Sequence, residues 1–160
     1  MPKLARTIHF DASDQQIFEN PATTGEWAVS GAFAFADWSD DDLQGKARQA
    51  FANGWLGIGS FGRATFVAVA RIEDSELATA TRELAGHLQA EYGAPSFDAA
   101  LAAAEEEIAF MQDLCRDMDA NTLLAVQREM GETGVHEQFR NIAPKETNLS
   151  QLAVHGSLDY

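Results

Sequence analysis

The chain contains a short apolar run, residues 64–72, that is rich in β-branched and aromatic side chains and follows a glycine-containing loop. Such a run is typical of a β-strand that is buried on at least one face and lies near the middle of a sheet. Residues 26–35 have the same character and predict a second, longer strand. Its large side chains fall on one face, as expected where a sheet packs against other elements: Trp27, Val29, Phe33 and Phe35.

The rest of the N-terminal half predicts two more strands and one helix. Residues 4–10 alternate loosely and indicate a first strand, and residues 17–19 indicate a short one. The loops between these strands are too short for crossover helices, so we expect antiparallel pairing. Ser39 and the aspartates at 40–42 mark the start of a helix that ends at residues 53–54. The aspartates would also suit a divalent cation, but helix capping explains them without a further assumption.

The C-terminal half is predicted to be mostly helical. One helix is expected from residue 74 or 75 to 92 and another over residues 97–118. A further helix, capped by Asn121 or Thr122, is expected to end at Met130. Residues 135–142 fit either an amphipathic turn or a short extended piece. Residues 144–160 are polar and aperiodic and are predicted to form a C-terminal tail.

These elements predict a single α+β domain over residues 1–143, because a chain of 160 residues has the usual size of one domain. We expect a small, mostly antiparallel sheet from the N-terminal half, packed against helices from the C-terminal half.

The helix over residues 97–118 carries apolar side chains at alternating spacings of four and three, a heptad pattern. This stripe either packs on the sheet within one chain or forms a contact between the helices of two subunits. The second alternative leads us to expect a homo-oligomer. Its predicted interface residues are Phe97, Leu101, Ala104, Ile108, Met111 and Cys115.

The formal net charge is −14, from 25 acidic and 11 basic residues. This charge repels nucleic acids and anionic membrane surfaces, so we expect neither as a partner. No apolar run reaches the roughly 20 residues that cross a bilayer, and the N-terminus lacks the pattern of a secretory signal. We therefore expect a soluble, cytoplasmic protein whose partner is another protein or a second copy of itself.

No local motif points to catalysis. The four histidines lie in separate segments, and no pair has the spacing of zinc ligands. Cys115 falls in an apolar pattern, as a buried thiol would. The three consecutive glutamates at residues 105–107 point in different directions around a helix, which is typical of a solvent-exposed face. We expect no cofactor and no metal, and we assign no catalytic residue.

The loop at residues 57–62 matches the pattern G-x-G-x-x-G. A dinucleotide-binding loop of this kind follows a strand and opens a helix, whereas here a helix precedes the loop and a strand follows it. The glycines instead permit a tight entry into the sheet or a close approach of the backbone to a ligand. The ligand-binding residues predicted around this loop are Gly57, Gly59, Gly62, Arg63, Trp27, Trp55 and Phe61.

Two blocks, residues 25–35 (Gly-Glu-Trp-Ala-Val-Ser-Gly-Ala-Phe-Ala-Phe) and 54–62 (Gly-Trp-Leu-Gly-Ile-Gly-Ser-Phe-Gly), resemble a small family of uncharacterised bacterial proteins. The resemblance covers most of the chain and implies no activity or catalytic residue. Our leading hypothesis is a non-catalytic accessory or assembly protein that acts through protein contacts. The alternative is a small-molecule-binding protein or enzyme with a pocket near residues 57–63.

Overall fold

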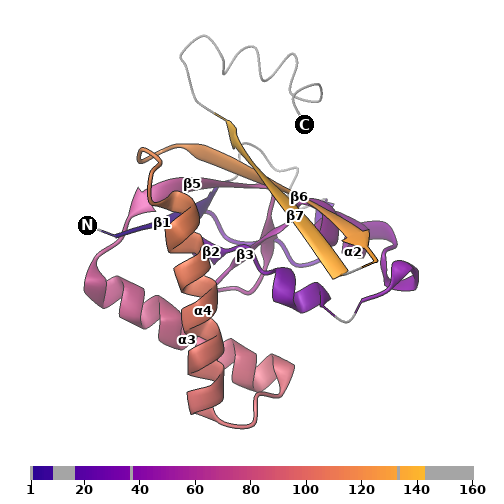
Figure 1. Cartoon of the computed structure of the whole chain (residues 1–160), viewed down its shortest axis with the longest axis horizontal. Coiled ribbons are helices and arrows are strands. Elements are labelled where there is room, and N and C mark those ends of the chain that lie inside the picture. The colour runs from indigo at the N-terminus through magenta and orange to yellow at the C-terminus, as the bar shows by residue number, and fades with distance from the viewer. Residues whose placement is uncertain (1, 9–16, 37, 133, 143–160) are drawn as a thin grey trace.

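The computed structural model describes residues 2–8, 17–36, 38–132 and 134–142. Within these ranges, seven strands form one antiparallel sheet in the order β4-β3-β2-β1-β5-β6-β7 (Figure 1). The strands are β1 (Lys3–Ile8), β2 (Trp27–Val29), β3 (Trp55–Gly57), β4 (Arg63–Ala64), β5 (Phe66–Arg71), β6 (Leu123–Gly131) and β7 (Gly134–Ile142). The α+β class is confirmed. The predicted tail at residues 144–160 lies outside the described ranges.

The centre of the sheet is the pair β1–β5, as the apolar run at residues 64–72 predicts. The two strands pair from Lys3↔Arg71 to Ile8↔Phe66. Leu4 and Val69 are fully buried, because helices cover one face of this pair. Residue 64, which begins the predicted strand, belongs instead to β4, the short strand that it forms with residue 63 at the edge of the sheet.

The predicted strand over residues 26–35 ends at Val29. Gly31 then has a φ of 78°, and a Cβ at this position would lie 2.5 Å from the Cβ of Leu56. The chain turns out of the sheet here and forms a short 3-10 helix, η1 (Ala32–Phe35). Residues 17–19, predicted as a strand, are not paired in the sheet.

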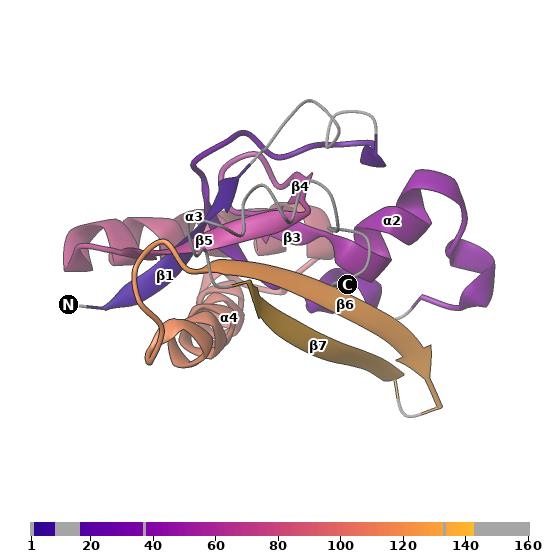
Figure 2. The same cartoon turned by 90° about the horizontal axis from the view of Figure 1, so that it is seen from above.

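Three α-helices have clear sequence signals. In place of one predicted helix at 39–53, the chain forms a short 3-10 helix, η2 (Asp40–Asp42), and then the α-helix α2 (Gly45–Asn53). The Ser39 amide donates a hydrogen bond to the Asp42 carboxylate. Helix α3 (Asp74–Tyr92) confirms the prediction there, and α4 (Phe97–Cys115) confirms the next predicted helix but ends three residues earlier than the predicted end at residue 118. Helix α4 packs on β1 and β2, and α3 packs along α4. Helix α2 lies at the opposite end of the molecule from the N-terminus (Figures 1 and 2).

The prediction of a helix after Asn121 is wrong, because residues 123–131 form strand β6. Asn121 adopts a left-handed φ of 72°, and its amide donates to the carbonyl of Val69 at 2.7 Å. This turn places residues 123–126 in a buried position beside β5. Strand β7 then pairs with the whole of β6, so the extended alternative for residues 135–142 is the observed one.

The part of the chain that the structure describes contains no helix long and apolar enough to cross a membrane.

Candidate functional site

Two buried arginines hold together the end of the molecule that contains α2. Arg128 of β6 is 3% exposed, and its Nη1 donates to the carbonyl oxygens of Phe51 at 2.9 Å and Gly54 at 2.8 Å. Its Nε donates to the Glu137 carboxylate of β7 at 2.8 Å. The cation therefore lies at the C-terminal end of α2, where the helix dipole is negative.

Arg63 of β4 lies beside Arg128 and shares two of its carbonyl partners. Its Nη1 donates to Gly54 at 3.2 Å and Ser30 at 3.5 Å, and its Nη2 donates to Gly31 at 3.2 Å. The guanidinium also lies 4.6 Å above the centre of the Phe35 ring. These contacts join the end of β2, η1 and the end of α2 around one side chain.

Burial and neighbouring charges shift the pKa values of three side chains in this region. Burial, and secondly the charge of Arg128, lower the pKa of Arg63 to about 9, so that its guanidinium stays charged at neutral pH. Burial lowers the pKa of Arg128 as well, against the opposing effect of Glu137. On α4, burial and the negative charge of Glu137 raise the pKa of Glu107 to about 7.

A cleft of about 680 Å³ opens beside Arg63, between η1, α2 and the turn before β4. We call it the aromatic cleft. Its lining includes four polar side chains, Glu19, Asn20, Lys46 and Arg63. It also includes six aromatic side chains: Phe18, Phe33, Phe35, Trp38, Phe61 and Tyr92.

Five of the six aromatic side chains in the lining form two groups of rings in contact. In the first, Phe33 lies 6.3 Å from Phe61 and 5.4 Å from Tyr92, and Phe61 is stacked on His87 at 4.4 Å. In the second, Phe35 meets Trp38 edge-on at 4.8 Å. Phe35 is buried, whereas Phe33, Trp38 and Phe61 are half-buried and present apolar surface to the cleft.

The glycine loop holds a carboxylate of the chain itself. The Glu26 carboxylate accepts hydrogen bonds from the Ser60 amide at 2.7 Å and the Ser60 hydroxyl at 2.6 Å. A Cβ at Gly57 would lie 2.7 Å from the Glu26 carboxylate, and one at Gly59 would lie 3.2 Å from it. A Cβ at Gly62 would lie 2.6 Å from the carbonyl oxygen of Pro21. These glycines therefore make room for contacts within the chain.

The structure brings together only part of the predicted ligand site. Arg63 and Phe61 line the aromatic cleft. Trp55 is fully buried in the core instead, and Trp27 lies under the guanidinium of Arg6 at 4.0 Å, outside the cleft. The sequence analysis did not identify Phe33 or Lys46 as site residues, because their positions depend on the turn at Gly31 and on the placement of α2.

The heptad stripe of α4 is largely used within the chain. Ala104, Ile108, Met111 and Cys115 are 0–3% exposed and belong to the hydrophobic core. They are consequently not available to a second subunit, whereas Phe97 is 41% exposed and Leu101 is half-buried. Burial raises the pKa of the Cys115 thiol to about 11, which disfavours the reactive thiolate.

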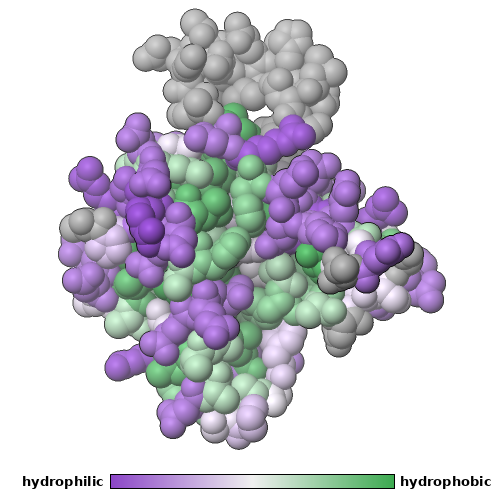
Figure 3. Space-filling view, viewed as in Figure 1, coloured by the Kyte–Doolittle hydropathy of each residue, from purple (hydrophilic) through white to green (hydrophobic). Residues whose placement is uncertain are grey.

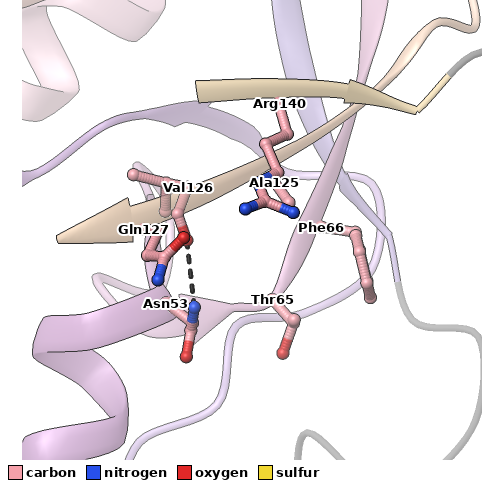
Figure 4. Close-up of a pocket in the computed structure, with 7 residues that line it drawn as sticks. All are labelled: Asn53, Thr65, Phe66, Ala125, Val126, Gln127 and Arg140. Atoms are coloured by element: carbon pink, nitrogen blue, oxygen red, sulfur yellow. Dashed lines mark hydrogen bonds between the residues drawn. The ribbon is translucent and has the colours of Figure 1, made fainter. Parts of the chain in front are cut away.

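A second cavity, of about 350 Å³, lies where β6 separates from β5 (Figure 4). The side chain of Arg140 extends from β7 toward this space, and the Asn53 amide donates to the carbonyl of Val126 at 3.1 Å (Figure 4). Thr65 and Gln127 complete its polar lining. It is smaller than the aromatic cleft and has one aromatic side chain, Phe66.

The described residues contain no group of three or more histidine, cysteine or acidic side chains placed to hold a metal ion.

The chain belongs to DUF6505, a family of unknown function whose model matches residues 1–160. This confirms the resemblance to an uncharacterised family. No match was found among curated proteins or among solved structures.

Proposed function

We propose, for a chain whose family has no assigned activity, that this protein binds a small molecule with an aromatic ring in the aromatic cleft. The observation that carries this proposal is the cleft itself, with about 680 Å³ of space and six aromatic side chains in its lining. Ligand pockets typically measure about 300–1,000 Å³ and combine apolar or aromatic walls with a few polar groups. Half-buried rings of Phe33, Trp38 and Phe61 offer edges and faces for stacking.

Native mass spectrometry of the gently purified full chain provides the first test. We expect a mass increment that is lost on denaturation and that is absent from the Trp38→Ala variant. Trp27→Ala is the matched control, because Trp27 is also half-buried but lies outside the cleft. Retention of the same increment by Trp38→Ala, or its equal loss in both variants, would contradict binding in the cleft.

A second candidate function is the one that the sequence favoured, a non-catalytic accessory or assembly role through protein contacts. Apolar side chains gather in a band on the face shown in Figure 3. Phe110 of α4 is 44% exposed, and its ring lies 5.7 Å from that of Phe139 of β7. An exposed apolar surface of this kind suits a protein partner or self-association as a homo-oligomer.

The two candidates differ in which variant is affected. Phe110→Ser should weaken association with a protein partner or a second copy, measured by light scattering after size-exclusion chromatography, and should leave the cleft ligand bound. Trp38→Ala should do the reverse. A cytoplasmic location remains a prediction in either case.

A further inference from the structure

Two of the N–H groups in the Arg63 guanidinium form no hydrogen bond with the described part of the chain. An arginine side chain carries five N–H donors. Nη1 donates to the carbonyls of Gly54 and Ser30, and Nη2 donates to that of Gly31. Within the described part of the chain, Nε–H and one Nη2–H have no partner. Nε and Nη2 form the side of a guanidinium that binds both oxygens of a carboxylate.

The Arg63 side chain lines the aromatic cleft, although only 8% of its surface is exposed. The guanidinium with these two unpartnered N–H groups is therefore part of the wall of the cleft.

The charged groups around the cleft leave one positive charge to be balanced. Behind Arg63, the charge of Arg128 is paired with Glu137 at 2.8 Å. On the cleft lining, Lys46 and Glu19 carry opposite charges and cancel. No described carboxylate forms an ion pair with Arg63, although Glu137, the partner of Arg128, also favours its charged form. A ligand with one negative charge would supply a direct partner.

We infer that the aromatic cleft binds an aromatic monocarboxylate, with the carboxylate on Nε and Nη2 of Arg63 and the ring between the two aromatic groups. This inference rests on the proposed function and specifies its ligand class. A neutral ligand leaves the guanidinium without a counter-charge, and a cationic ligand is repelled by it. Bidentate, charge-assisted bonds from arginine are about twice as strong as neutral hydrogen bonds, so carboxylate recognition dominates the choice of ligand.

The test compares probes of one shape and different charge on the wild-type full chain. The probes are 2-naphthoate, 2-naphthamide, 2-naphthylmethylamine and 2-naphthyl phosphate, titrated at pH 7 and followed by NMR shifts of the Trp38 indole N–H. We expect 2-naphthoate to bind at least tenfold more tightly than the amide, and the amine to bind most weakly. Tighter binding of the phosphate than of the carboxylate would overturn the carboxylate assignment.

Failures of the two proposals give different results. Equal binding of the carboxylate and the amide at Trp38 overturns the present inference but supports an aromatic-binding cleft. Absence of any shift at Trp38 with all four probes overturns both proposals.

Variants then assign the preference to Arg63. Arg63→Lys keeps the positive charge but removes the paired donors, so the carboxylate-to-amide ratio should fall to less than threefold. Arg48→Lys is the matched control, because Arg48 is exposed on α2 and does not line the cleft, so this variant should retain the ratio. An unchanged ratio in a folded Arg63→Lys protein contradicts the inference. The wild-type probe series decides it independently if that variant does not fold.

Discussion

Glu107 is a carboxylate whose protonation changes on folding. Burial and the neighbouring negative charges raise its pKa from 4.5 to about 7, so the folded protein holds this proton where the unfolded chain has released it. Stability from this group is therefore present at low pH and is lost as the pH rises from 4.5 to about 7. We expect Glu107→Gln to stabilise the protein by about 2 kcal/mol at pH 8, after allowance for partial exposure to solvent, and by less than about 1 kcal/mol at pH 5.

Urea unfolding at the two pH values measures this difference. Glu105→Gln is the control, because Glu105 is exposed on the same helix and its substitution should change stability by less than about 0.5 kcal/mol. An equal effect of Glu107→Gln at both pH values would contradict the assigned role of its carboxyl group.

Gly57 is required by the position of the Glu26 carboxylate. A methyl group at residue 57 would lie 2.7 Å from Oε1 of Glu26 and would displace it from the Ser60 amide. We expect Gly57→Ala to lower the free energy of unfolding by about 0.5–1.5 kcal/mol, because the displaced Glu26 carboxylate loses its hydrogen bonds to Ser60. Gly86→Ala in α3 meets no atom within 4 Å and should stabilise the protein by about 0.5–1 kcal/mol.

A double mutant separates this clash from other effects of the methyl group. In a Glu26→Ala background the Gly57→Ala substitution should cost much less, because the carboxylate is already absent. Additive costs for the two substitutions would show that the Glu26 contact does not explain the glycine.

Individual site residues were predictable only where local sequence marks them. Phe61 lies within the glycine loop and Arg63 follows it directly, and both line the cleft. Arg128 carried no such signal, because its partners at Phe51 and Gly54 are 77 and 74 residues away in the chain. Glu26 was missed for the same reason, since a glycine pattern does not show which group approaches it.

Arg128 provides hydrogen-bond donors to the backbone carbonyl groups at the C-terminal end of helix α2. The guanidinium takes up the carbonyls of Phe51 and Gly54, and its own charge is paired with Glu137. We expect Arg128→Met to destabilise the protein by about 3–5 kcal/mol, because the substitution leaves a carboxylate and several carbonyls without their buried partner. Thermal unfolding followed by circular dichroism measures the loss.

Arg116→Met is the control for this prediction. Arg116 also pairs with an acidic residue, Asp113, but the two side chains are 69% and 65% exposed. Such an exposed pair contributes about 0–1 kcal/mol. Comparable losses from the two substitutions would show that burial does not determine the value of the Arg128 contacts.

The hairpin of β6 and β7 is attached to the sheet over only part of its length. Strand β6 pairs with β5 from Leu123 to Ala125, and residues 129–131 pair with β7 alone. We expect amides of residues 129–131 to exchange with deuterium faster than those of 123–125, measured by NMR under native conditions. Equal protection at the two ends would indicate that the hairpin opens as one unit.

This hairpin also shows why one element was assigned wrongly from sequence. Residues 123–126 form a continuous apolar run, which fits a buried strand and a buried helix equally well. The amphipathic helices α3 and α4 have no such ambiguity, because their apolar side chains recur at helical spacing over five turns. The positive φ of Asn121, which directs the chain into β6, is a tertiary feature without a decisive local pattern.

The whole molecule carries a net charge of −14, which favours expansion through self-repulsion. Salt at 0.15 M screens charges over about 8 Å. We expect the thermal midpoint to rise between 10 and 150 mM NaCl and to rise equally in KCl, measured by differential scanning calorimetry. A fall in the midpoint would mean that attractive ion pairs exposed to solvent, such as Arg6 with Glu76, outweigh the general repulsion.

The contacts of Arg128 have a consequence for how the protein is made. The guanidinium joins Ser30 to residue 128 across 98 residues of chain, and it orders the carbonyls that also hold Arg63. During synthesis, the first hundred residues leave the ribosome without this side chain, although every aromatic residue of the cleft is already present. The set of contacts that holds Arg63 at the cleft is thus complete only after β6 has been translated.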